Sequence, residues 1–100
     1  MEKNYYNTDK LLNILRNHSL SICRLYGISR IGLFGSYARG VQKESSRIDI
    51  LVEPENITLD SLYNLRKHLC DILGTEVIIH TSDNLKPSVK SYVECEVIYV

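Results

Sequence analysis

A glycine and a serine, Gly35 and Ser36, directly follow the apolar run at residues 31–34. Because glycine has no side chain, a phosphate group can approach the backbone of Gly35 closely. The Ser36 hydroxyl and the amides that open the next segment can donate hydrogen bonds to it. The triphosphate tail of a nucleotide fits this chemistry. Taken alone, the same dipeptide also makes an ordinary turn between a strand and a helix.

Asp49 is the acidic residue best placed to act together with this turn. Apolar residues 48, 50 and 52 alternate with Asp49 and Glu53 until Pro54, which predicts a strand that carries Asp49. Arg47 lies two residues before Asp49, so both side chains are expected on the same face of that strand. An arginine there can pair with the carboxylate of Asp49 or contact a phosphate directly.

Helices are predicted on both sides of these two segments. One is capped by Thr8 or Asp9 and ends at Gly27, and a second starts at Thr58 or Asp60 and ends at Gly74. Shorter helices are predicted over residues 37–39 and from residue 84 to about residue 94, and further strands over residues 76–80 and 96–100. This order indicates a small α/β or α+β fold in which helices flank a short mixed sheet.

Composition narrows the class of protein. A length of 100 residues suits a single domain over residues 1–100. The 12 basic residues balance the 12 acidic ones, so no overall field favours nucleic acid. The three cysteines show no Cys-x-x-Cys pair, which argues against a disulfide framework and a structural zinc site. No run approaches a membrane span, so a cytoplasmic protein with reduced thiols is expected.

The motif Phe34-Gly35-Ser36-Tyr37-Ala38-Arg39-Gly40, then a polar loop and Ser46-Arg47-Ile48-Asp49-Ile50-Leu51-Val52, resembles the minimal nucleotidyltransferases. These are the small antitoxin-like members of the polymerase-beta-type nucleotidyltransferase superfamily. The resemblance covers nearly the whole chain and implies the nucleotidyltransferase fold, with ATP or another NTP and Mg²⁺ as cofactors. It assigns Asp49 to catalysis and to any bound metal. It implies phosphate contacts for Gly35, Ser36, Arg39 and Arg47, although Arg39 can instead form a salt bridge or stabilise its turn.

Two of the three carboxylates that this family uses are replaced. Position by position, Arg47 falls on the first aspartate, Asp49 on the second, and Ile78 on the third acidic residue. Nucleotidyl transfer in this superfamily uses two divalent ions about 4 Å apart, which need several carboxylate oxygens between them. Metal binding is therefore opposed by lost ligands and by the charge of Arg47. Nucleotide binding can outlast catalysis.

Other side chains are weaker candidates for the site. Glu53 shares a face with Asp49 but lies roughly 13 Å away along the strand. Glu76 or His80 reaches the site only if the strand register is shifted, and Glu44 only if its loop bends inward. Tyr37, next to Ser36, can flank a bound base or phosphate.

Three functions remain open from the sequence. The first is a degenerate family member, a nucleotide-binding or partner-binding antitoxin-like module with weak or no transfer activity. The second is an active Mg²⁺-dependent enzyme that moves a nucleoside monophosphate to a protein hydroxyl. The third is a pure protein-interaction module that neither binds nor transfers a nucleotide and uses a sheet edge. A homodimer is also open. The resemblance implies a HEPN-type ribonuclease toxin as partner, with no membrane role.

Overall fold

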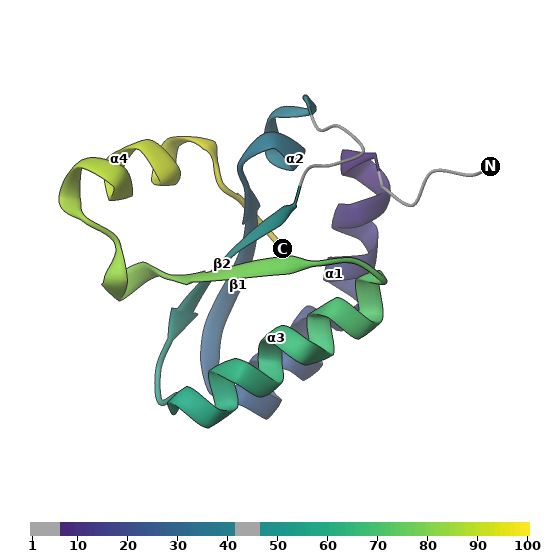
Figure 1. Ribbon diagram of the computed structural model, residues 1–100, viewed down its shortest axis with the longest axis vertical. Coiled ribbons are helices and arrows are strands. Elements are labelled where there is room, and N and C mark those ends of the chain that lie inside the picture. Colours follow the sequence, from purple (N-terminus) through teal and green to yellow (C-terminus); the bar gives the residue numbers. More distant parts are fainter. Residues whose placement is uncertain (1–6, 42–46) are drawn as a thin grey trace.

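The computed structural model describes residues 7–41 and 47–100. Helices and strands alternate along the chain (Figure 1). In order, the elements are α1 (Thr8–Tyr26), β1 (Ile28–Phe34), α2 (Ser36–Arg39), β2 (Ile48–Pro54), α3 (Leu59–Leu73), β3 (Val77–Thr81), the 3₁₀ turn η1 (Ser82–Asn84), α4 (Pro87–Glu96) and β4 (Ile98–Tyr99). The predicted mixed α+β fold is confirmed.

Side-chain caps and left-handed glycines set the limits of the two long helices. The Asn7 side chain accepts a hydrogen bond from the backbone N–H of Lys10 at 2.8 Å, so α1 is capped by Asn7 and not by the predicted Thr8 or Asp9. Thr58 caps α3 in the same way, as the sequence predicted. Both helices end at the expected glycines, Gly27 with φ 72° and Gly74 with φ 68°.

The four strands form one mixed sheet in the order β3-β2-β1-β4. β1 runs antiparallel to β2 and β4, whereas β2 and β3 are parallel and are joined through α3. In this register Phe34 pairs with Asp49, and Asp49 pairs with Ile78. The end of β1 and the starts of β2 and β3 therefore meet at one end of the sheet, which is where the Gly35 turn lies.

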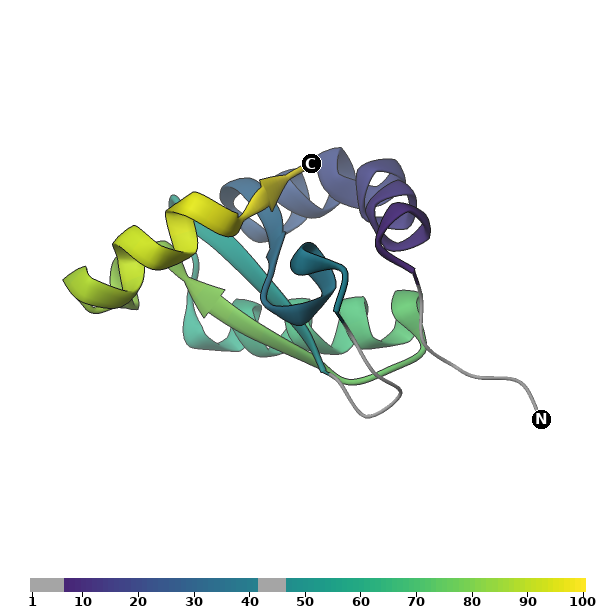
Figure 2. The ribbon, with the colours of Figure 1, turned by 90° about the horizontal axis from the view of Figure 1, so that it is seen from above.

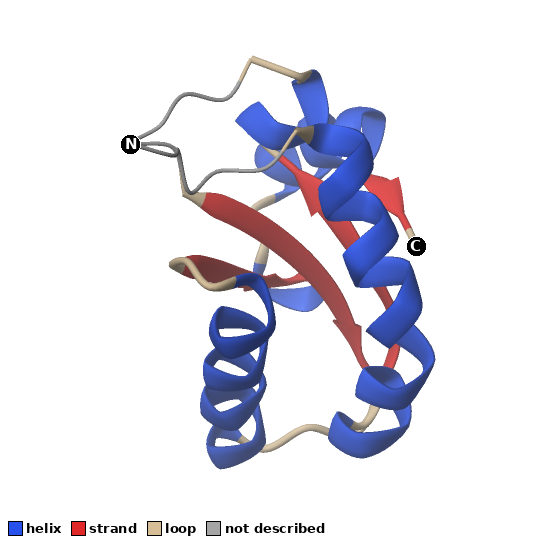
Figure 3. Ribbon diagram, turned by 90° about the vertical axis from the view of Figure 1, so that its right-hand side faces the viewer, coloured by secondary structure: helices blue, strands red, loops and turns tan. Residues whose placement is uncertain are grey.

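Alternation along the strands divides the sheet into two faces. One face is covered by α1 and α3, the two long helices beside the strands in Figure 3. Leu15 of α1, Leu65 of α3 and Ile50 of β2 belong to one buried cluster on this face. On the opposite face a smaller cluster of Phe34, Leu51 and Val93 packs beneath α4, which projects away from α3 in Figure 2. Asp49 alternates with the buried residues of the first face and so lies on the α4 side.

The C-terminal elements differ from the sequence prediction. The predicted helix to about residue 94 extends to Glu96, and the predicted strand over residues 96–100 shrinks to Ile98–Tyr99. The chain leaves α4 through Val97, whose N–H still bonds to the carbonyl of Val93. Glu96 is therefore a helix residue, and its side chain turns toward the end of β1.

The sequence also made predictions about the cysteines and about membrane-spanning helices. Cys23, Cys70 and Cys95 are free thiols, in agreement with the absence of a predicted disulfide framework. Cys95 is exposed, whereas Cys23 and Cys70 are half-buried. Within residues 7–41 and 47–100, no helix is long and apolar enough to cross a membrane.

Candidate functional site

The Gly35 turn lies directly against the carboxylate of Asp49. Gly35 ends β1 with φ 81° and ψ −155°, a conformation that side chains rarely adopt. A Cβ atom at this position would lie 2.7 Å from Oδ2 of Asp49, closer than real contacts allow. Only a residue without a side chain lets the backbone and the carboxylate approach this closely. The structure thus brings together two of the residues that the sequence selected.

The other oxygen of Asp49 faces β3. Nε2 of His80 lies 3.4 Å from Oδ1 of Asp49, a long hydrogen bond between two partly exposed side chains. The His80 and Phe34 rings pack in a T-shaped arrangement, with ring centroids 4.9 Å apart. His80 reaches Asp49 in the observed register, so the prediction that this contact needs a register shift is wrong. Ile78, paired with Asp49 across the strands, presents an apolar side chain beside the carboxylate.

Arg47 stands just outside the strand on which it was predicted. β2 begins at Ile48, and Arg47 is exposed immediately before it. Among the described residues no ion pair joins Arg47 to Asp49, so the hypothesised pairing of the two is not formed. None of the described residues forms an ion pair with its guanidinium. Ser46 of the motif and Glu44, a weaker candidate for the site, lie outside the described residues.

Arg39 is held by the C-terminal helix α4. Its Nη1 atom lies 3.1 Å and 3.0 Å from the two carboxylate oxygens of Glu96, and 3.4 Å from the Tyr92 hydroxyl. The same carboxylate accepts a hydrogen bond from the backbone N–H of Gly35 at 3.0 Å. The hydrogen bond that Arg39 donates to Glu96, followed by the charge of Glu96, raises the pKa of the Arg39 guanidinium, and Asp49 adds a smaller effect in the same direction. The salt-bridge interpretation of Arg39 is therefore correct.

The sequence prediction missed Glu96 because it placed this residue in a strand. Val93, Glu96 and Val97 follow the helical spacing i, i+3, i+4, and Val93 is buried. That pattern was enough to extend the helix and to place Glu96 on its packed side. It could not show the partner, since Glu96 and Gly35 are 61 residues apart in the chain.

Ser36 and Tyr37 differ sharply in exposure. Ser36 opens α2 and is half-buried, and no described group binds its hydroxyl. Tyr37 is 1% exposed and belongs to the main hydrophobic core with α1 and α3. The hypothesis that Tyr37 flanks a bound base or phosphate is therefore wrong: its ring packs into the core, and Ser36 is the residue left facing outward.

The residues around Asp49 do not match the donor set of a two-metal centre. Its neighbours across the strand pairs are Phe34, Ile78 and, at 3.4 Å, the His80 ring. No group of three His, Cys, Asp or Glu side chains in the described parts of the chain could hold a metal ion. Two Mg²⁺ ions require several carboxylate oxygens. The described side chains supply one suitable carboxylate, so they do not fit this cofactor by themselves.

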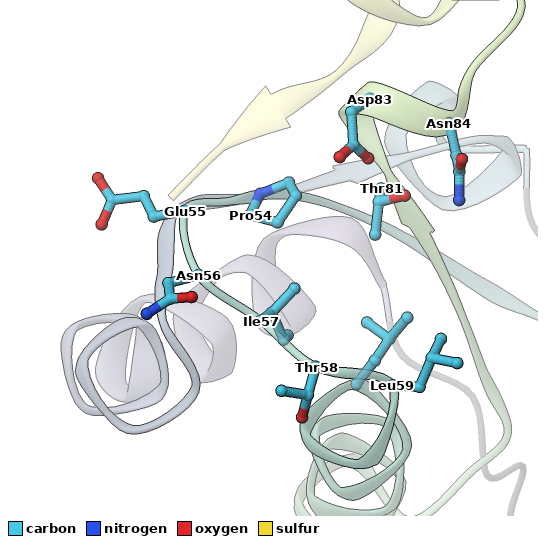
Figure 4. A pocket seen from close by; sticks show the side chains of 10 residues that line it. Pro54, Glu55, Asn56, Ile57, Thr58, Leu59, Thr81, Asp83 and Asn84 are labelled. Carbon is cyan, nitrogen blue, oxygen red and sulfur yellow. The ribbon is translucent and has the colours of Figure 1, made fainter.

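A hollow at the opposite end of the sheet contains none of the predicted site residues (Figure 4). It lies between the end of β2, the start of α3 and η1, with Thr58, Thr81 and Asp83 around it. Its described lining carries two carboxylates, Glu55 and Asp83, and no cation, so its charge disfavours a phosphate. The Gly35 end of the sheet therefore remains the candidate site.

Comparison with known proteins places this site in a family. The family model described as nucleotidyltransferase domain matches residues 15–100, most of the chain. The chain belongs to the nucleotidyltransferase domain family. Two relatives span nearly the same length. The predicted protein adenylyltransferase MJ1217 of Methanocaldococcus jannaschii is 40% identical over 93 residues, which cover 91% of this chain and 95% of the relative. The protein adenylyltransferase MntA of Thermococcus cleftensis is 37% identical, with 92% and 94% covered.

Solved structures confirm the resemblance to minimal nucleotidyltransferases. A predicted minimal nucleotidyltransferase superposes with a TM-score of 0.82 and 34% identity, over 94% of this chain and 96% of the other. A more distant structure is an MNT antitoxin in complex with a tri-AMPylated HEPN toxin of Shewanella oneidensis. Its TM-score is 0.57 at 20% identity, over 93% of this chain and 67% of the other, so it shows the shared fold alone.

Proposed function

We propose that this nucleotidyltransferase-family protein is an antitoxin-like module that binds a nucleotide through its phosphates and has weak or no transfer activity. The proposal rests on the residues that surround Asp49. This carboxylate has Ile78 and His80 as neighbours on β3, and Arg47 stands just before its strand. A fixed positive charge and an apolar side chain occupy the positions that would supply further metal ligands.

Phosphate binding has separate support from the groups around the Gly35 turn. The Ser36 hydroxyl is half-buried without a described partner, and the exposed guanidiniums of Arg39 and Arg47 flank the same end of the sheet. Arginine recognises phosphate oxygens with paired N–H donors and needs no metal for this. Nucleotide binding is therefore expected to persist when divalent ions are removed.

The proposed protein partner is a HEPN-type toxin. An MNT antitoxin of the same fold is found in complex with such a toxin. A module that has lost transfer activity can still neutralise its partner by binding, provided that the interface does not depend on the metal site. The cytoplasm is the proposed location, in line with three cysteines that remain free thiols.

An active enzyme is the second candidate, favoured by the names of the relatives. Proteins 37% to 40% identical to this chain are described as protein adenylyltransferases. In that case the transfer of AMP to a protein hydroxyl would rest on Asp49 with a ligand from outside the described residues. The two candidates differ in their dependence on divalent ions.

The decisive experiment is a calorimetric titration of the purified protein with ATP, with Mg²⁺ and with a chelator. We expect equal affinity in the two buffers, and no AMP incorporated into a co-purified HEPN-type protein from labelled ATP. Asp49→Asn should leave this binding unchanged, whereas Arg47→Ala should weaken it. Binding that requires Mg²⁺, together with AMP transfer that Asp49→Asn abolishes, would instead establish the enzyme. Absence of ATP binding in both buffers would reject both.

A further inference from the structure

Within the described residues, Arg39 forms its side-chain hydrogen bonds through one nitrogen of the guanidinium group, Nη1. All three acceptors around it, the two oxygens of Glu96 and the Tyr92 hydroxyl, are bound by Nη1. A guanidinium carries five N–H donors in a rigid plane, and two of them are on Nη1. Among the described residues, no group accepts from Nε or Nη2. The edge formed by these two nitrogens remains available.

That free edge has the geometry of a phosphate receptor. Nε and Nη2 present two parallel N–H bonds, the arrangement that binds two oxygens of one phosphate group. The Arg39 side chain is 46% exposed, whereas that of Glu96 is 15% exposed. Glu96 is thus the fixed member of the pair and Arg39 the member that faces solvent.

Glu96 also holds the turn that the site depends on. Its Oε1 accepts a hydrogen bond from the Gly35 N–H at 3.0 Å. β4 pairs with Gly32 and Leu33 of β1, and this contact continues the pairing toward the end of β1. The side chain therefore takes the place of the next strand partner at the end of β1. One carboxylate fixes both the backbone at Gly35 and the side chain of Arg39.

We propose that Glu96 is a positioning residue of the nucleotide site: it anchors Nη1 of Arg39 and so presents the Nε–Nη2 edge to a nucleotide phosphate. Tyr92 supports the same anchor from one turn earlier in α4. The inference rests on the proposed function, because it assigns a role in nucleotide binding. It adds to that function a part of the site supplied by the C-terminal helix.

The test is a double-mutant cycle with Glu96→Gln and Arg39→Gln, using metal-free titrations with ATP and with inorganic tripolyphosphate. Glutamine keeps the size of Glu96 and an oxygen that can accept from Gly35, but it removes the charge that holds Arg39. The cycle cancels the general repulsion between Glu96 and a polyanion, because that term is present in both arms. What remains is the coupling free energy, which shows how far the contribution of Arg39 to binding depends on Glu96.

If Glu96 positions Arg39, Arg39→Gln should weaken the binding of both probes about tenfold when Glu96 is present. In the Glu96→Gln background, the same change should weaken binding about twofold or less. Glu94→Gln, an exposed charge change on the same helix, should leave the effect of Arg39→Gln at its full size. An equal or larger effect of Arg39→Gln without Glu96 would overturn the inference, since Glu96 would then be a competitor for Arg39.

Two further results separate the inference from the proposed function. If the wild-type protein binds neither ATP nor tripolyphosphate, the proposed function fails and the inference fails with it. If the wild type binds both but the cycle shows no coupling, only the inference fails. Should Glu96→Gln unfold the protein, Tyr92→Phe replaces it in the cycle, because it removes the other Nη1 acceptor from an exposed position. In the Tyr92→Phe background, the effect of Arg39→Gln on binding should then be about twofold smaller than in the wild type.

Discussion

Gly35 and Asp49 are in such close contact that a methyl group at Gly35 would lie 2.7 Å from Oδ2 of the carboxylate. Gly35→Ala must therefore move the turn or Asp49, in addition to the strain of its positive φ. We expect a loss of about 2–3 kcal/mol in the free energy of unfolding, measured by urea denaturation.

Gly74→Ala is a control for the positive φ alone, because the ψ of Gly74 is 22° and that of Gly35 is −155°. Gly74 has a similar φ of 68°, and nothing lies within 4 Å of the Cβ that alanine would add. Backbone strain alone should cost about 1 kcal/mol there. Equal losses in the two variants would show that the contact with Asp49 contributes nothing.

Arg47→Asp is expected to strengthen Mg²⁺ binding. The change removes a positive charge and adds a carboxylate two residues before Asp49, at the start of β2. Calorimetric titration with Mg²⁺ measures the gain, which should be about tenfold or more in affinity. Arg47→Ala, which removes the charge without adding a ligand, should give a smaller gain. Metal affinity that is the same in all three proteins would argue against a place for residue 47 at this site.

Acid should weaken the contact between β1 and β2. Nη2 of Arg30 lies 2.7 Å from Oε2 of Glu53, and this hydrogen bond lowers the pKa of Glu53 below its usual value. A lowered pKa means that the contribution to stability is present above the unfolded-state pKa and is lost as pH falls through the folded-state pKa. Glu53→Gln should therefore be less stable than wild type at neutral pH.

Urea denaturation from neutral pH down to about pH 2 follows this difference. The gap between wild type and Glu53→Gln should close as the carboxylate is protonated. Glu55→Gln, at an exposed carboxylate nearby, should show no such gap. A gap that stays constant over the whole range would mean that charge on Glu53 is not what stabilises the pair.

The thiols should differ in reactivity. Cys95 is exposed, whereas Cys23 is half-buried and its pKa is raised by burial and then by the charge of Glu55. Since the thiolate is the reactive form, a thiol reagent should modify Cys95 before Cys23 at neutral pH. Mass spectrometry of partly labelled protein measures the order, and urea-unfolded protein should show no preference. Faster labelling of Cys23 in the folded state would contradict the structure.

Local signals in the sequence were sufficient for most of the fold. Gly27 and Gly74 end helices because few other residues adopt a left-handed conformation at low cost, and the alternation around Asp49 marks a strand with one buried face. The cap of α1 was misplaced by one residue because Asn7, Thr8 and Asp9 all have suitable side chains. Adjacent capping residues leave such a choice to tertiary packing.

The site was predictable only in part, because two of its contacts join distant segments. Gly35, Ser36 and Asp49 could be chosen from their residue types and spacing. The contact of His80 with Asp49 depends on the parallel register of β2 and β3, and that of Glu96 with Gly35 on how α4 returns to the sheet. Neither register nor helix direction is encoded in a short pattern, since many packings satisfy the same alternation.

The position of Glu96 in the chain also bears on the order in which the protein assembles. Loop closure over 61 residues costs more entropy than the nearby pairing of β1 with β2, and a chain leaving the ribosome presents its N-terminal segments first. The sheet and its two long helices can therefore form around Asp49 while Arg39 still lacks its anchor. Until α4 packs against the sheet, Arg39 lacks Glu96 and Tyr92, the residues that bind its Nη1, so the proposed phosphate site is completed after the sheet.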